Sequence, residues 1–224
     1  MKLAITIIAA LATIFVLPAM GESAQFWSDQ ANGYFISGDF ENAVASYDKA
    51  LELEPVSIEL WNNKGKALAN LGQIDNAISC FDISLAINSS NPESLNLKGI
   101  ALSQGLNKYS EAIAVFDQAL LLNSSYFDAW IGKGMALANE GNLYSSLECF
   151  EKATQIKPQD TTGWNNKGVV LRQMERYQDA LTCFNNALVI DPSYEVAQQN
   201  REYTLQDLNQ ITQASPSRSA QNVL

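Results

Sequence analysis

Apolar residues recur along the chain at spacings of three and four, which is the spacing of one face of an α-helix. The pattern is clearest over residues 164–192, in two blocks joined by a short polar turn. The first block places its signature at i, i+3, i+4 and i+7: Trp164, Lys167, Gly168 and Leu171. The second block uses i, i+4 and i+7 and stops at a proline: Ala180, Phe184, Ala187 and Pro192. The two blocks predict an αα-hairpin, which needs neighbours because it cannot bury its apolar face alone.

The same frame recurs four more times toward the N-terminus. The position of Trp164 returns at intervals of 34, 35, 34 and 34 residues: Trp130, Leu95, Trp61 and Trp27. A small residue follows four places later in every copy: Gly168, Gly134, Gly99, Gly65 and Ala31. An aromatic residue lies in every second half: Phe184, Phe150, Phe116, Phe81 and Tyr47. The third copy has one extra residue between Leu102 and Ala112, which we expect in the turn because an insertion would rotate a helix face.

This pattern resembles the tetratricopeptide repeat (TPR), a unit of about 34 residues with a Trp, Gly, Tyr, Ala, Phe and Pro signature. The resemblance covers residues 24–192. It implies an all-α fold, a right-handed α-solenoid of five TPR helix-turn-helix hairpins. It implies function only as binding, since the fold is a scaffold shared by unrelated proteins.

Residues 193–211 keep a helical pattern but lose the repeat signature. Gln198 stands where the Trp is expected, and Glu202 stands where the Gly is expected. We predict a capping helix with one face on the last repeat, supplied by Ala197, Leu205 and Leu208, and a polar face toward water. Residues 212–224 are polar and without periodicity, and we expect a disordered tail there.

The N-terminal segment is strongly apolar. Lys2 precedes an uncharged run over residues 3–17, and Ala19 and Gly21 are small residues suited to a cleavage site. Residues 1–21 are therefore predicted to be a secretory signal peptide. The alternative is an uncleaved signal anchor, because residues 3–21 are free of charge and just long enough to cross a bilayer. In both cases we expect an extracytoplasmic location, with membrane contact only through residues 3–21 if they are retained.

The amino-acid composition disfavours several classes of function. The formal charge is −10, from 24 acidic and 14 basic residues, which disfavours binding to nucleic acid. The chain has no histidine, the commonest general base and metal ligand. Its three cysteines, Cys80, Cys149 and Cys183, occupy one equivalent repeat position, which favours a role as small packing residues. We expect no metal, no cofactor and no catalytic site.

A lysine directly precedes the small residue in four repeats: Lys64, Lys98, Lys133 and Lys167. One interpretation is a stem that covers apolar surface while the ammonium group reaches water. The alternative is a ladder that binds anions.

The resemblance places the residue after the Trp, and the residue four further on, in a concave groove lined by the first helices. Asparagine fills the first of these places in three repeats, and amides that both donate and accept can hold an extended peptide backbone. The other interpretation is that these polar residues simply face solvent. The candidate binding residues are Ser28, Asn32, Asn62, Asn63, Lys66, Asn96, Ile131, Asn165 and Asn166.

Some members of the family hold acidic C-terminal tails with a clamp of lysine, arginine and asparagine. Asn32 and Asn63 match two clamp positions, but Ser28 stands where a lysine is expected, and Glu93 and Leu97 stand where the third repeat should be basic. This groove is therefore not expected to hold such a tail.

The leading hypothesis is a non-enzymatic scaffold that binds a protein or an extended peptide in the groove. The alternatives are a non-catalytic subunit of an envelope enzyme complex and a self-associating structural spacer.

Overall fold

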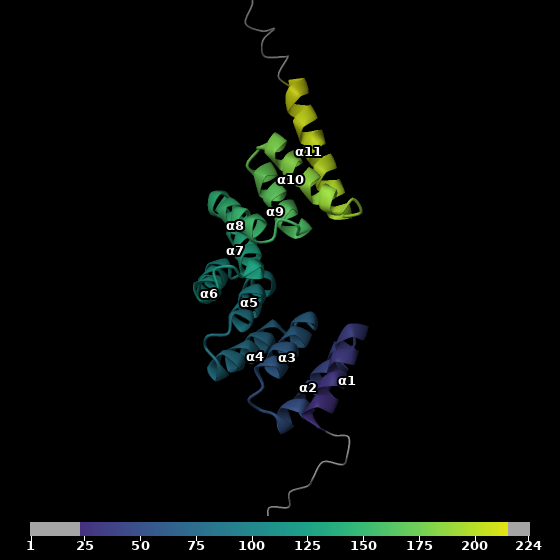
Figure 1. Ribbon diagram of the computed structural model, residues 1–224, viewed down its shortest axis with the longest axis vertical. Helices are drawn as coiled ribbons and strands as arrows, with labels where there is room; N and C mark the ends of the chain where they lie inside the picture. The colour runs from purple at the N-terminus through teal and green to yellow at the C-terminus, as the bar shows by residue number, and fades with distance from the viewer. Residues whose placement is uncertain (1–22, 215–224) are drawn as a thin grey trace, which may run out of the picture.

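The computed structural model describes residues 23–214 and shows a row of helical hairpins (Figure 1). Residues 1–22, which include the predicted signal segment, lie outside the described residues. Within residues 23–214 the chain forms eleven α-helices, one π-helical turn and no strand. The elements are α1 (Ala24–Ser37), α2 (Phe40–Leu53), α3 (Ile58–Asn70), α4 (Ile74–Ile87), α5 (Pro92–Ile100), η1 (Ala101–Gly105), α6 (Tyr109–Leu122), α7 (Phe127–Asn139), α8 (Leu143–Ile156), α9 (Thr161–Gln173), α10 (Tyr177–Ile190) and α11 (Glu195–Ala214).

The hairpins pair as the sequence predicts. The first helices are α1, α3, α5, α7 and α9, and each packs against the second helix that follows it. Each second helix also packs against the first helix of the next repeat, and α10 packs in the same way against α11. The predicted α-solenoid of five hairpins followed by a capping helix is confirmed. No helix of the described chain is both long enough and apolar enough to span a bilayer.

The core of the second to fifth hairpins is an aromatic ring set against a glycine. The rings of Phe81, Phe116, Phe150 and Phe184 are at most 1% exposed. A Cβ atom added to Gly168 would lie 2.5 Å from the Phe184 ring, and Gly65, Gly99 and Gly134 are equally close to their own rings. The small residue of the signature is required by this close approach of the two helices.

Three tryptophans tie their first helices, α3, α7 and α9, to the turn that precedes each of them. The indole Nε1 of Trp61 donates to the carbonyl oxygen of Pro55 at 2.9 Å, and Trp164 donates likewise to Pro158 at 2.8 Å. Trp130 makes the equivalent bond to Ser124 at 2.9 Å. The signature Trp is therefore both a packing residue and a hydrogen-bond donor.

The four repeated lysines link adjacent repeats. Each ammonium group reaches a carboxylate on the second helix of the preceding repeat: Lys64 to Asp48 at 2.5 Å, Lys98 to Asp82 at 2.6 Å, Lys133 to Asp117 at 2.6 Å and Lys167 to Glu151 at 3.3 Å. The lysine side chains are only 19–26% exposed, so their stems do cover apolar surface. These ion pairs bridge the joints between hairpins.

The extra residue of the third repeat lies in a helix, not in the turn, and that expectation was wrong. It is absorbed by the π-helical turn η1, where each hydrogen bond spans one residue more than in an α-helix. The backbone N–H of Lys108 then closes the end of the helix on the carbonyl oxygen of Leu102 at 2.9 Å. The π turn restores the helix face after the insertion.

The capping helix α11 is held by one face. Ala197 and Thr204 are fully buried, and Arg172 donates to the carboxylate of Asp207 at 2.7 Å. Two details differ from the prediction. Leu205 was expected on the inner face but is 42% exposed. The helix also continues to Ala214, so residues 212–214 are helical and not part of a tail, while residues 215–224 lie outside the described residues.

Candidate protein-binding groove

The first helices form one continuous surface. From α3 onward each first helix contacts the next, and α9 contacts α11. The predicted groove residues all lie on these helices, but the structure divides them into three groups. Four residues line hollows between the first two repeats: Ser28, Asn32, Asn63 and Lys66. Three are buried where successive first helices meet, namely Asn62, Asn96 and Asn165. Ile131 and Asn166 are partly buried further along the row.

The N-terminal hollow lies between the first and second repeats and has a volume of about 330 Å³. Its lining is Asn32, Phe35 and Ile36 of α1, Tyr47 of α2, and Asn63 and Lys66 of α3. Ile36 is 86% exposed, so a large apolar side chain stands at its edge without cover. Three of the predicted residues, Asn32, Asn63 and Lys66, are thus brought together around one opening.

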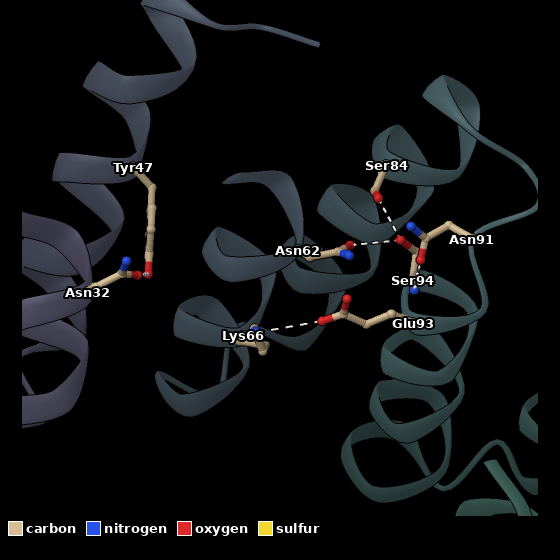
Figure 2. A network of polar contacts seen from close by, with 8 residues as sticks. All are labelled: Asn32, Tyr47, Asn62, Lys66, Ser84, Asn91, Glu93 and Ser94. Atoms are coloured by element: carbon tan, nitrogen blue, oxygen red, sulfur yellow. Dashed lines mark hydrogen bonds and ion pairs between the residues drawn. The ribbon is translucent and has the colours of Figure 1, made fainter. Parts of the chain in front are cut away.

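Asn32 is fixed by Tyr47 in this hollow. The Tyr47 hydroxyl donates to Oδ1 of Asn32 at 2.6 Å, and Figure 2 shows the two side chains meeting across the hairpin. Burial of the ring, with a smaller contribution from Glu59, raises the pKa of Tyr47 to about 12, so the phenol stays protonated as the donor. With Oδ1 engaged, the amide nitrogen is the end of Asn32 that can donate to a ligand.

A smaller hollow of about 80 Å³ adjoins on the other side of Asn32. It is lined by Ala24, Gln25, Ser28 and Asn32 from α1 together with Glu54, Ser57, Glu59 and Leu60. Ser28 is only 8% exposed and lies at its floor. The space is sized for a few waters or a small polar group.

Lys66 is only loosely held at the edge of the larger hollow. Its Nζ lies 4.0 Å from a carboxylate oxygen of Glu93, with side chains 37% and 58% exposed (Figure 2). An exposed pair of this kind is worth roughly 0–1 kcal/mol. Lys66 can therefore turn to a carbonyl or carboxylate of a ligand at little cost.

Asn62 is buried and not available in the groove as predicted. It is 2% exposed, and its Oδ1 accepts from the Ser94 hydroxyl at 3.0 Å. Ser94 also shares a 2.7 Å hydrogen bond with Ser84, and Figure 2 shows this chain running from α3 across α5 to α4. The amide joins the second repeat to the third.

Asn165 and Asn96 occupy the same buried position in other repeats, each 5% exposed. Oδ1 of Asn165 accepts from the amide of Asn200 at 2.9 Å, which joins α9 to α11. Oδ1 of Asn96 is buried without a hydrogen-bond partner among the described residues, because Ala129 stands where the preceding joint has Ser94. The predicted row of open amides is thus buried, and Asn62 and Asn165 form hydrogen bonds between neighbouring repeats.

The last two predicted residues lie far from the hollow along the row. Ile131 is partly buried against the core that includes Leu147, Phe150 and Val170. Asn166 is half-buried on α9. A binding role for any of the nine residues remains a prediction.

Sequence reasoning missed three residues of the hollow: Phe35, Ile36 and Tyr47. The repeat pattern identifies Tyr47 only as the aromatic residue of its second helix, and it is 1% exposed, but its hydroxyl reaches Asn32. The available signal was the single tyrosine at a position where every other repeat has phenylalanine.

Comparisons with known proteins agree with this architecture. Family models described as TPR repeat or tetratricopeptide repeat match residues 31–72, 58–91, 103–161 and 162–194. The chain belongs to the tetratricopeptide repeat family. No curated protein matches the sequence significantly.

Several solved structures share the fold. YrrB, described as a TPR protein with an unusual peptide-binding site, is 27% identical, with a TM-score of 0.60 over 81% of this chain and 93% of that one. MamA from Desulfovibrio magneticus is 22% identical, with a TM-score of 0.65 over 79% and 99%. A thermophilic TPR protein from Thermus thermophilus is 16% identical, with a TM-score of 0.69 over 81% and 98%.

Proposed function

We propose that this protein is a non-catalytic scaffold that binds an extended segment of a partner protein along its first helices. The observation that carries the proposal is the N-terminal hollow, where the exposed Ile36 and the partly buried Phe35 adjoin the polar groups of Asn32, Asn63 and Lys66. Such a combination suits one apolar side chain of a peptide together with the backbone amides on either side of it. The similarity to YrrB, a TPR protein with a peptide-binding site, supports the same class of ligand.

The lining of the hollow indicates which groups of the peptide it would contact. Ile36 and Phe35 offer contact to an apolar side chain, while the Asn32 amide and the Lys66 ammonium are donors for backbone carbonyls. The tyrosine bond holds Asn32 in place before the ligand arrives, which lowers the entropy lost on binding.

The test uses a random-peptide display library selected against the full chain. The enriched peptides are then measured against Ile36→Asp and Lys66→Ala, with Leu121→Asp as the control, because Leu121 is 87% exposed on α6 away from the hollow. We expect Ile36→Asp to weaken binding by about tenfold or more, a loss of about 1.4 kcal/mol, and Leu121→Asp to leave it unchanged. Equal binding by all variants would remove the hollow as the binding site.

We also propose that residues 1–21 export the protein or anchor it outside the cytoplasm. The support is the uncharged apolar run that follows Lys2. Mass spectrometry of the mature N-terminus, combined with protease access to intact cells, tests this. A full-length chain that is inaccessible to protease would contradict the proposal.

A further inference from the structure

The capping helix leaves open a surface that every other repeat buries. Leu205 occupies the signature leucine position, one period after Leu171. The leucines at that position in the four preceding repeats are 2–6% exposed, while Leu205 is 42% exposed: Leu68, Leu102, Leu137 and Leu171. In those repeats the residue is covered by the second helix of the same hairpin. Among the described residues, α11 has no such second helix.

A hollow of about 490 Å³ marks the open place between α10 and α11. It is lined by Leu188, Pro192, Gln198, Arg201, Glu202 and Leu205. Three of the four equivalents of Leu188 at the earlier joints are 6–8% exposed because the next repeat covers them: Leu51, Leu120 and Thr154. The fourth, Leu85, is only partly buried, as Leu188 is. The apolar position that has lost its usual cover at the C-terminal hollow is therefore Leu205.

The occupant of this hollow cannot be an ordinary second helix of a TPR hairpin. Such a helix would bring its aromatic ring against the signature glycine, where even an added Cβ lies 2.4–2.8 Å from the ring. Glu202 stands at that position in α11. An occupant must leave room for the Glu202 side chain and place a positive group near it, and it must offer a negative group to Arg201.

A second copy of α11 meets these requirements. In an antiparallel pair related by a two-fold axis between Arg201 and Glu202, each arginine faces the glutamate of the other copy. The same axis sets Leu205 of each copy opposite Gln198 of the other, over the apolar floor made by Leu188 and Pro192. The surface is therefore complementary to itself in charge, and it sets Leu205 of each copy against a hollow whose lining includes Leu188 and Pro192.

We propose that the protein forms a homodimer through this face of α11. The contacts that attach α11 to its own chain, Ala197, the Asn165–Asn200 bond and the Arg172–Asp207 pair, lie on another face and stay intact. The dimer also leaves the N-terminal hollows free. Each particle then presents two peptide-binding hollows, which raises avidity for a partner that is itself repeated or clustered.

The test is sedimentation velocity on labelled full chain titrated with unlabelled full chain. We expect the wild type to show a concentration-dependent monomer–dimer equilibrium. Arg201→Glu and Glu202→Arg should each weaken it by about tenfold or more, because two attractive pairs become repulsive. Two arrangements should restore it: the double variant Arg201→Glu/Glu202→Arg, and a mixture of the two single variants. Restoration in the mixture shows that positions 201 and 202 of one copy face those of the other, and restoration in the double variant requires residue 201 to face residue 202.

Leu205→Gln gives a second, uncharged test, with Leu122→Gln as its control because Leu122 is 46% exposed on α6. We expect dimerisation to weaken only with Leu205→Gln. Residues 1–22 are present in every chain compared, so any effect of theirs is common to all. A wild type that stays monomeric would overturn the proposal. So would a dimer unaffected by the variants, or a mixture of the charge variants that fails to associate. None of these variants touches the N-terminal hollow, so loss of dimerisation leaves the peptide-binding test unchanged.

Discussion

Gln198 Nε2 donates a 2.7 Å hydrogen bond to the backbone carbonyl of Pro192, the bond that Trp164 makes to Pro158 one repeat earlier. Donor and acceptor are six residues apart in both cases. Gln198 stands at the tryptophan position, so an amide replaces the indole N–H when the packing role of the ring is no longer needed. At this position the capping helix keeps the hydrogen bond of the repeat signature but not the apolar ring.

We predict that Gln198→Leu loosens the start of α11. The lost hydrogen bond should cost about 0.5–1.5 kcal/mol, while Gln198→Trp should keep the bond. Hydrogen exchange of the amides in residues 195–205 measures the local opening. If Gln198→Leu left the hydrogen exchange rates of these amides unchanged, the bond would contribute nothing to holding the start of α11 on the last repeat.

The buried amides predict one substitution that lowers the free energy of unfolding and one that raises it. Ser94→Ala leaves Oδ1 of Asn62 buried without its donor and should destabilise the protein by about 1–3 kcal/mol. Ala129→Ser places a hydroxyl at the equivalent position beside Asn96, whose Oδ1 is buried without a partner among the described residues, and should stabilise by about 0.5–1.5 kcal/mol. Denaturant unfolding measures both. A loss of stability with Ala129→Ser would mean that the joint of repeats three and four cannot form this bond.

Two glycines predict opposite effects of the same substitution. An added Cβ at Gly134 would lie 2.8 Å from the Phe150 ring, so Gly134→Ala should cost about 1–3 kcal/mol through overpacking. Gly33 lies within α1 with nothing within 4 Å of an added Cβ. Gly33→Ala should stabilise by about 0.5–1 kcal/mol because alanine favours the helix. Thermal unfolding compares the two, and similar shifts for both would contradict the proposed ring contact.

The buried thiols predict that the free energy of unfolding falls at alkaline pH. Burial raises the pKa of Cys149 and of Cys183 from 9.0 to about 11. The unfolded chain releases these protons first, so the stability that the neutral thiols contribute is complete below pH 9 and falls as pH rises toward 11. Chemical unfolding across this range should show the decline. A Cys149→Ala/Cys183→Ala variant should show a smaller one, and equal slopes would assign the effect to other groups such as Tyr47.

The repeat architecture could be predicted from the sequence because each signature residue has one physical task that recurs. Phe184 needs Gly168, and Trp164 needs the turn before it, so spacing alone identifies the hairpin. The joints between repeats could not be predicted in this way. Whether an asparagine faces the groove or a neighbour depends on the residue one repeat away: Ser94 for Asn62, and Asn200 for Asn165.

The repeat frame shows Glu175 at the position where other repeats have a turn glycine, but not which backbone conformation it takes. Glu175 adopts a φ of 59° where Gly72 and Gly141 adopt 74° and 90°, so the backbone keeps the turn although the residue disfavours it. The π turn at residues 101–105 is a second case, since the sequence shows an insertion but not which segment accommodates it. The burial of Asn62 changes how its substitution should be interpreted, because Asn62→Ala now reports on stability and not on ligand contact.

The lysine bridges join each hairpin only to the one before it, from Lys64 with Asp48 to Lys167 with Glu151. In an array built from such joints each hairpin depends for its stability on its immediate neighbours alone. The loss of one bridge is therefore felt at one joint and is not transmitted to hairpins further along the row.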